Sequence, residues 1–189
     1  MNPILSILTP TIPGREAKLK ELSDLIAKHS KGLPIEHLVL CDNRQRSIGA
    51  KRQALVEIAR GEYIAFVDDD DEVTPEYCKK LVEAAKTGAD VISFCQMAYV
   101  NEHKSLVVFS SKNADSPFTP GGITNRNLWH VCAWRREVIA GCLFGESNYG
   151  EDLVWCQQAR GRVRTEHHIP DTLHIYRHSE ETTAAPMPV

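Results

Sequence analysis

Apolar residues fall into two alternating patterns over the first 95 residues of the chain, short continuous runs and stripes with helical spacing. The continuous runs predict strands at residues 4–8, 35–41, 63–67 and 91–95. The stripes between them predict helices at residues 15–28, 47–60 and 74–87. Strands that alternate with helices in this way predict an α/β fold with a mostly parallel, doubly wound sheet and helices on both faces.

The pattern changes after residue 96, where the predicted elements are shorter and more irregular. They are a hairpin over 97–109, a mobile loop over 110–125, a strand over 128–134, a short helix over 135–140, a helix to about 160, and strands at 162–166 and 172–176. The length suits a single domain, 1–189, and residues 179–189 are expected to be a disordered tail.

The third predicted strand runs directly into four carboxylates, Asp68 to Asp71. Loops just beyond the carboxyl ends of parallel strands are where open α/β sheets bind ligands. Because adjacent carboxylates repel one another, holding four of them at a strand end favours a bound cation. The alternative is a solvated acidic turn ahead of a helix, where acidic residues are favourable in themselves.

The helix predicted after Ser47 begins with features that suit a phosphate group. Ser47 is a suitable N-cap, and Gly49 lets another group approach the backbone closely. Lys51 and Arg52 lie in the opening turns, where the helix dipole disfavours cations. Free N–H groups, a glycine and two bases therefore predict anion binding. The alternative is a basic surface helix that tolerates a small dipole penalty.

Composition argues against a strongly charged or membrane-spanning protein. The formal net charge is −3, so no global attraction to nucleic acid or to an anionic membrane is expected. No apolar run approaches about 20 residues, the length that spans a bilayer. The first residues lack the basic region of a secretion signal, so a cytoplasmic location is expected. The six cysteines lack metal-cluster spacing and are predicted to be buried free thiols.

Five motifs, in order along the chain, resemble those of the GT-A fold glycosyltransferases of family 2, which use nucleotide sugars. The motifs are Thr9-Pro10-Thr11 after the first strand, Asp42 after the second, Gly49 to Arg52 at a helix start, Gly61 to Asp71 with its Asp-x-Asp sequence, and Gly150-Glu151-Asp152 opening a late helix. The resemblance extends from Ile4 to His178. It implies a Rossmann-like GT-A fold with a nucleotide-binding half (1–96) and a smaller, mixed acceptor-binding half (97–178).

The resemblance also implies which residues bind a metal ion and the donor. Asp70 would ligate Mn²⁺ or Mg²⁺ with Asp68 beside it, and His178 would be a further ligand, with His174 as the other histidine for that place. The donor, a UDP-sugar, would contact a set of residues around the strand ends. These are Thr9, Pro10, Thr11, Asp42, Gly49, Lys51, Arg52, Asp68 and Asp69.

The same resemblance implies the chemistry of an inverting hexosyltransferase. Asp152 matches the general base of the family, which takes the proton of an acceptor hydroxyl during in-line attack at the anomeric carbon. The metal would stabilise the leaving diphosphate, and Glu151 would hold the acceptor. His130 and Trp129 fall where relatives contact the acceptor or close the sugar pocket, and a place in the core is the alternative for Trp129. For Glu151 and Asp152, simple capping of a helix is the alternative.

The motifs leave the acceptor and the oligomeric state open. The acceptor is expected to be a carbohydrate, a lipid-linked sugar or a hydroxymethylated base in DNA. The basic clusters Arg44-Arg46-Lys51-Arg52 and Arg160-Arg162-Arg164 favour DNA, and the net charge of −3 weakens that reading. Two alternatives belong to other classes, a nucleotidyltransferase and a catalytically inactive nucleotide-binding module. The chain has little of the Gly-rich loop expected of the first, and it keeps the acidic pairs that the second would be expected to lack.

Overall fold

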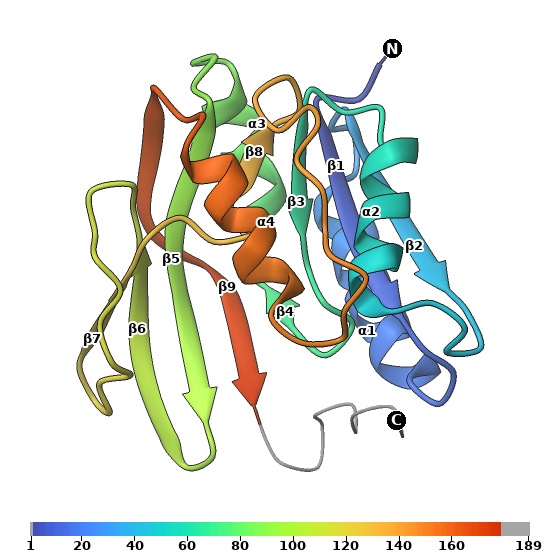
Figure 1. Cartoon of the computed structure of the whole chain (residues 1–189), viewed down its shortest axis with the longest axis horizontal. Helices are drawn as coiled ribbons and strands as arrows, with labels where there is room; N and C mark the ends of the chain where they lie inside the picture. Colours follow the sequence, from blue (N-terminus) through green and yellow to red (C-terminus); the bar gives the residue numbers. More distant parts are fainter. Residues whose placement is uncertain (1, 179–189) are drawn as a thin grey trace.

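A nine-stranded sheet runs through the computed structural model, which describes residues 2–178 (Figure 1). Its main path has the strand order β2–β1–β3–β8–β5–β6–β7, and β9 pairs with both β4 and β5 beside this path. The strands are β1 (Leu5–Thr11), β2 (Ile35–Cys41), β3 (Tyr63–Phe66), β4 (Glu72–Val73), β5 (Val91–Val100), β6 (His103–Phe109), β7 (Ile123–Arg126), β8 (Ala133–Arg135) and β9 (Glu166–His178). The helices are α1 (Glu16–His29), α2 (Ile48–Ile58), α3 (Tyr77–Ala85) and α4 (Glu151–Arg160).

The strands of the first half are parallel, as the sequence predicts. β1 pairs in parallel with both β2 and β3. β8 pairs antiparallel with β3 and with β5, so β5 runs in the same direction as β3. β9 is parallel to β5, and β6 is antiparallel to it. The predicted mostly parallel sheet with a mixed later region is therefore confirmed, with β8 as a reversed strand within it.

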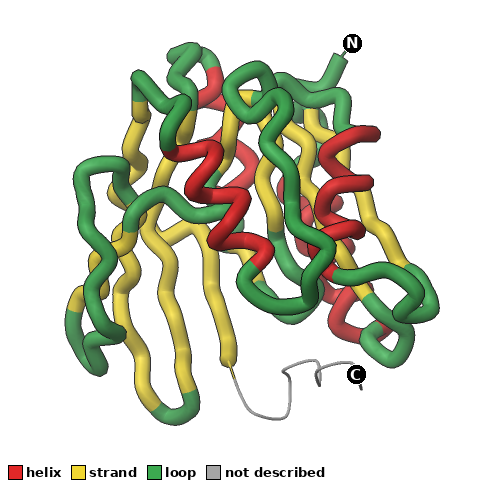
Figure 2. The backbone as a smooth tube through the Cα atoms, in the orientation of Figure 1, coloured by secondary structure: helices red, strands yellow, loops and turns green. Residues whose placement is uncertain are grey.

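Helices cover both faces of this sheet, which Figure 2 shows as helical segments in front of and behind the strands. α1 and α3 join one hydrophobic core, and α2 and α4 join the other. Tyr63 and Ala65 of β3 belong to the first core, whereas Ile64 and Phe66 belong to the second. β3 is thus buried on both faces, as expected of a central parallel strand, and the segment after it starts from a fixed position.

β1 continues to Thr11, although the proline content of this segment predicts that the strand ends at Leu8. The carbonyl of Leu8 accepts a hydrogen bond from the N–H of Val67, next to β3. Because backbone groups alternate in direction along a strand, Pro10 faces the same side. Pairing with β3 ends at Leu8, so the missing N–H of Pro10 costs no ladder hydrogen bond. Pairing with β2 carries β1 on to Thr11.

The last strand also differs from its prediction. The runs 162–166 and 172–176 are predicted to be separate strands, yet β9 is continuous from Glu166 to His178. Its pairing with β5 shifts register on both sides of Cys95, which leaves Pro170, Asp171 and Leu173 outside the regular ladder. Bulges of this kind let a sheet accept a proline that would otherwise end the strand.

Other predicted elements of the second half are corrected in part. The predicted strand 128–134 is reduced to β8, and the predicted short helix over 135–140 is a series of turns. Part of the loop predicted at 110–125 forms β7. The predicted hairpin is confirmed by β5 and β6. In the first half, α3 begins at Tyr77, later than predicted.

Three remaining expectations concern the thiols, the membrane and the tail. All six cysteines are free, and five of them are buried; Cys41, at the end of β2, is exposed. Within residues 2–178, no helix has both the length and the apolar character needed to cross a membrane. The tail predicted at 179–189 lies outside the described residues.

Candidate active site

The acidic run lies at the carboxyl edge of the sheet, directly after β3. Thr11 and Asp42 stand at the ends of the neighbouring strands β1 and β2. The hydroxyl of Thr11 donates a 2.5 Å hydrogen bond to Oδ2 of Asp69, which is 2% exposed. The hydroxyl of Thr9 is fully buried and donates to the carbonyl of Val67, so this side chain is used within the fold. Three predicted segments therefore meet at one edge.

Lys51 and Arg52 are buried cations that pair with carboxylates at this edge. Nζ of Lys51 lies 2.9 Å from Oδ1 of Asp42. Nη2 of Arg52 lies 2.9 and 2.8 Å from the two carboxylate oxygens of Asp68. Burial alone would lower the pKa of Arg52, but the charges of Asp68 and Glu151 outweigh it and raise that pKa. The two bases therefore balance the acidic strand ends, which explains their place in an unfavourable part of the helix.

The first N–H groups of α2 are not free for a phosphate, so this part of the prediction is wrong. The N–H groups of Ile48, Gly49 and Ala50 donate to Oδ1 of Asn148, the carbonyl of Ser147 and the hydroxyl of Ser47, respectively. A Cβ on Gly49 would stand 1.9 Å from the carbonyl oxygen of Gly145. The glycine thus admits the loop that precedes α4, and the N-cap prediction for Ser47 is confirmed.

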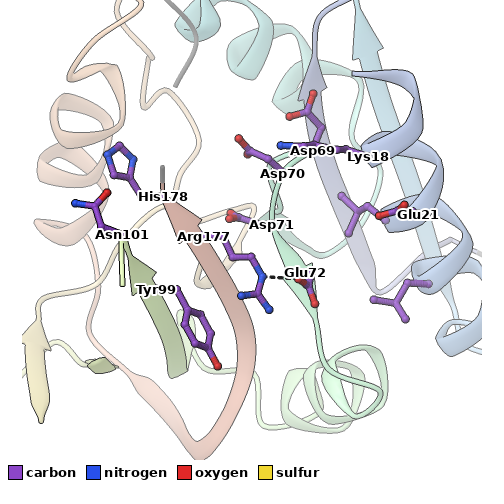
Figure 3. Close-up of a pocket in the computed structure, with 12 residues that line it drawn as sticks. Lys18, Glu21, Asp69, Asp70, Asp71, Glu72, Tyr99, Asn101, Arg177 and His178 are labelled. Atoms are coloured by element: carbon purple, nitrogen blue, oxygen red, sulfur yellow. Dashed lines mark hydrogen bonds and ion pairs between the residues drawn. The ribbon is translucent and has the colours of Figure 1, made fainter. Parts of the chain in front are cut away.

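Asp70 shares a cation with Asp69 and lines a cleft (Figure 3). Nη1 of Arg15, just ahead of α1, lies 2.5 Å from Oδ1 of Asp69 and 3.3 Å from Oδ2 of Asp70. Burial and the charge of Asp68 raise the pKa of Asp70, although Arg15 opposes this. Arg15 is not among the residues predicted from the sequence. A base directly after the proline-rich end of the first strand is the signal that points to it.

The two carboxylates at the start of α4 have different surroundings. Glu151 is buried, and its Oε1 lies 3.6 Å from Nη1 of Arg52; burial raises its pKa. The side chain of Asp152 is 24% exposed, and its Oδ2 lies 3.5 Å from Nδ1 of His130. His130 is buried, and neither of its ring nitrogens has a hydrogen-bond partner within residues 2–178. Burial and the charge of Arg52 lower the pKa of His130 well below its usual value, so the imidazole is neutral.

The two late histidines of β9 lie in different places. His174 is fully buried, with Nε2 3.4 Å from Oδ2 of the buried Asp71. Burial lowers the pKa of His174 to about 4 and raises that of Asp71 well above its usual value. His178 lines the same cleft as Asp70. In residues 2–178 no three His, Cys, Asp or Glu side chains are grouped to hold a metal ion, so Asp68, Asp70 and His178 do not form a three-residue site.

The basic clusters considered for DNA are used within the fold in part. Lys51 and Arg52 are each about 3% exposed. Arg160 donates to the carbonyl of Leu128, and Arg162 donates to that of Ala140. Buried or backbone-bound cations cannot neutralise a run of phosphates, and such contacts supply most of the affinity of proteins for DNA. Part of the feature that favoured a DNA acceptor is therefore used within the fold, whereas Arg44, Arg46 and Arg164 are exposed.

The arrangement joins two carboxylate groups through one buried guanidinium. Asp68 to Asp71 can attract a cation or a ligand that carries one, and Asp152 is exposed enough to accept a proton. Arg52 lies between Asp68 and Glu151, so the two groups are held in a fixed relation. Such a site can stabilise a leaving group on one side and remove a proton on the other.

Comparisons with known proteins show the family of the chain. A family model described as glycosyl transferase family 2 matches residues 19–141, well over half of the chain. A protein of Bacillus subtilis (strain 168) named as a glycosyltransferase, EpsH, is 40% identical over 47 residues, which make up 25% of this chain and 14% of that protein.

Solved structures of TarS from S. aureus share the fold. Residues 1–349 of TarS match with a TM-score of 0.65 and 17% identity, over 92% of this chain and 60% of that one. The same segment in complex with UDP-GlcNAc matches with a TM-score of 0.69 and 15% identity, over 96% of this chain and 61% of that one. The chain thus spans about 60% of the TarS segment and a small part of EpsH.

Proposed function

Because the chain belongs to glycosyl transferase family 2, we propose that it transfers a sugar from a nucleotide-diphosphate sugar to an acceptor hydroxyl, with inversion at the anomeric carbon. The observation that carries this proposal is the buried Arg52. Its guanidinium binds Asp68 after β3 and faces Glu151, the neighbour of Asp152, at the start of α4. A donor-side carboxylate and a candidate base are thereby held around one cation.

UDP-GlcNAc is the donor that we propose to test first. Two of the similar TarS structures are described as complexes with UDP-GlcNAc and with UDP. In this chain the nucleotide would lie at the ends of β1 and β2, against Thr11, Asp42 and Lys51. The first half of the chain would then bind the donor, and the acceptor would be bound by elements of the second.

Asp70, with Asp68, is the proposed site of a divalent ion. Mg²⁺ is often held by one or two carboxylates together with substrate phosphates and water, so a three-residue site is not required. The carboxylates fit this role, because burial and the charge of Asp68 raise the pKa of Asp70, and a cation would relieve that repulsion. When bound, Mn²⁺ or Mg²⁺ supplies Lewis-acid stabilisation of the leaving diphosphate.

Asp152 is the proposed general base. It takes the proton of the acceptor hydroxyl as the hydroxyl oxygen forms a bond to the anomeric carbon. The bond from that carbon to the diphosphate oxygen breaks on the opposite side, which inverts the configuration and releases the nucleoside diphosphate. Nδ1 of His130, 3.5 Å from Asp152, is a neutral group that can donate a hydrogen bond to the carboxylate and keep it oriented.

Slow hydrolysis of UDP-GlcNAc tests the proposal without a known acceptor, since water replaces the acceptor hydroxyl. In the presence of Mn²⁺ we expect UDP release, and we expect UDP with Mn²⁺ to raise the Tm. Asp70→Ala should lose the Tm shift. Asp152→Asn should keep the shift while hydrolysis falls about 10²-fold or more, the usual contribution of a general base. Asp24→Asn, on the exposed face of α1, is the control and should change neither quantity.

The outcomes separate the parts of the proposal. No release from any of a panel of nucleotide sugars, together with no Tm shift, would reject nucleotide-sugar transfer. A full Tm shift in Asp70→Ala would reject the metal site alone. Undiminished hydrolysis in Asp152→Asn would reject the base.

A further inference from the structure

A cleft of about 590 Å³ continues the site past Asp70 on the side of α1 (Figure 3). The segment from Asp69 to Glu72 forms its floor, α1 forms one wall, and the ends of β5 and β9 form the other. Its volume lies within the range of about 300–1,000 Å³ that is typical of small-molecule sites. Asp42, Lys51 and Asp152 do not line it. The cleft is therefore distinct from the proposed nucleotide pocket but borders the carboxylates that the two would share.

A stacked pair makes the wall formed by β5 and β9. The guanidinium carbon of Arg177 lies 4.5 Å from the ring centroid of Tyr99. Nε of Arg177 also donates to Oε1 of Glu72 at 2.7 Å, which fixes the plane of the guanidinium. Across the cleft, Leu22 and Leu25 of α1 provide apolar surface. Aromatic and apolar walls suit the C–H faces of a sugar ring, and the carboxylates of the floor can accept hydrogen bonds from its hydroxyl groups.

The lining carries more acid than base. Glu21, Glu72 and the three carboxylates from Asp69 to Asp71 face two bases, Lys18 and Arg177. Arg15 offsets part of the charge of Asp69 and Asp70. A phosphate in this cleft would meet like charges, which cost free energy and so select against such a ligand.

One rim of the cleft is formed by His178. The rings of Tyr176 and His178 stack with centroids 6.4 Å apart, and His178 lines the cleft. Asp70 also lines the cleft, so a ligand bound there lies beside the carboxylates of the donor side.

We propose that this cleft binds the acceptor, and that the part of the acceptor bound there is an uncharged or positively charged saccharide. The proposal rests on the proposed glycosyl transfer and adds the class of acceptor to it. Phosphorylated chains, DNA among them, are excluded by the charge of the lining. Tyr99 and Arg177 provide the surface on which the sugar ring lies, and Glu21 contributes to the rejection of phosphate.

Transfer from UDP-GlcNAc to p-nitrophenyl glycosides, and to the same glycosides carrying a 6-phosphate, tests this inference. We expect the neutral glycosides to accept the sugar with a kcat/KM at least about tenfold above that of their phosphates. In Glu21→Lys this preference should fall severalfold. In Tyr99→Ala the KM of the neutral glycosides should rise by about tenfold, the size of a lost aromatic contact. Glu83→Lys, the same charge change on the exposed face of α3, is the control and should leave both quantities unchanged.

Several results would overturn the inference. A preference for the phosphorylated glycosides is one, and an equal response of Glu21→Lys and Glu83→Lys is another. A third is a panel in which no neutral glycoside is either glycosylated or bound, with binding read from the amide chemical shifts of residues that line the cleft. If the wild-type protein hydrolyses UDP-GlcNAc and gives any of these results, the transfer reaction stands and the acceptor cleft fails. If no nucleotide sugar of the panel is hydrolysed and no Tm shift occurs, the proposed function itself fails.

Discussion

The carboxylates of the site are balanced in two different ways. For Asp42, Asp68 and Asp69 the partner is a permanent cation, Lys51, Arg52 and Arg15 respectively, at 2.5–2.9 Å. For Asp152 on α4, and for Asp71, which faces β9, the partner is a buried imidazole. His130 lies 3.5 Å from Asp152, and His174 lies 3.4 Å from Asp71. Burial lowers the pKa of both histidines, so these partners are neutral.

The difference assigns different chemistry to the two sides. Guanidinium and ammonium groups keep their charge across the pH range of proteins, so the donor side is a fixed electrostatic frame. An imidazole that is neutral and lacks a hydrogen bond does not fix the charge of the carboxylate that faces it. Proton transfer is therefore expected on the side of α4. The donor side is expected to bind the nucleotide sugar and to keep it in place. Each prediction below removes one partner.

Removal of Arg52 should have the largest effect on stability. Arg52→Met leaves the carboxylates of Asp68 and Glu151 without their buried cation, and breaking a buried pair in this way costs about 3–5 kcal/mol. The measurement is the free energy of unfolding in urea. Arg60→Met is a matched control, because Arg60 forms an ion pair of 2.7 Å with Glu36 but its side chain is 73% exposed. That variant should lose less than about 1 kcal/mol. Equal losses of unfolding free energy in the two variants would mean that the buried cation Arg52 stabilises the fold no more than an exposed one.

Replacement of His174 should change how stability depends on pH. The pKa of His174 is about 4 in the folded protein, against an ordinary value of 6.5. Between these pH values the unfolded chain binds a proton that the folded chain does not. Stability is therefore lost as the pH falls from 6.5 toward 4, with about 2 kcal/mol lost by pH 5 from this group alone. The raised pKa of Asp71 acts in the opposite direction.

His174→Gln removes this term, so its unfolding free energy should fall less steeply with decreasing pH than that of the wild type. His37, whose pKa burial also lowers to about 4, is unchanged in the variant and cancels in the difference. Parallel pH profiles for the two proteins would show that the pKa of His174 is the same in the folded and the unfolded chain, so that the folded imidazole gains its proton as readily as a free one. The buried imidazole would then resemble the cations of the donor side, and the contrast between the two sides would fail.

The contrast could be predicted from the sequence only in part. Alternation of apolar runs and helical stripes is enough to predict the parallel strands and the helices of the first half. The positions of the motifs are enough to predict that the acidic run and two bases lie at the strand ends. These residues are Asp68 to Asp71, Lys51 and Arg52. The reversed strand β8 and the continuous β9 depend on pairing partners and on bulges. Local periodicity carries no information about either.

Contacts between distant segments explain what the sequence could not show within the site. Because Gly49 has no side chain, the backbone of Gly145, almost a hundred residues later, can pack against it. No local sequence pattern predicts that contact. His174 and His178 have the same parity on one strand, so periodicity assigns them the same face. Four residues of strand separate them by about 13 Å, and this distance places only His174 against Asp71. The register of β9 therefore decides between them, and that register follows from the bulges near Cys95.

Replacement of His130 should have the smallest effect, and it tests the contrast at the proposed base. His130→Leu removes the ring nitrogen that lies 3.5 Å from Oδ2 of Asp152. If this nitrogen donates to the carboxylate during the reaction, kcat for hydrolysis of UDP-GlcNAc should fall by about tenfold, the size of one hydrogen bond to a charged group. KM for the donor should stay within about twofold. His130→Asn keeps an N–H group and should recover part of kcat. A fall in kcat with no recovery in His130→Asn would mean that His130 only fills space beside Phe66. Asp152 would then act as a base without help from His130, and the neutral imidazoles would contribute only to packing.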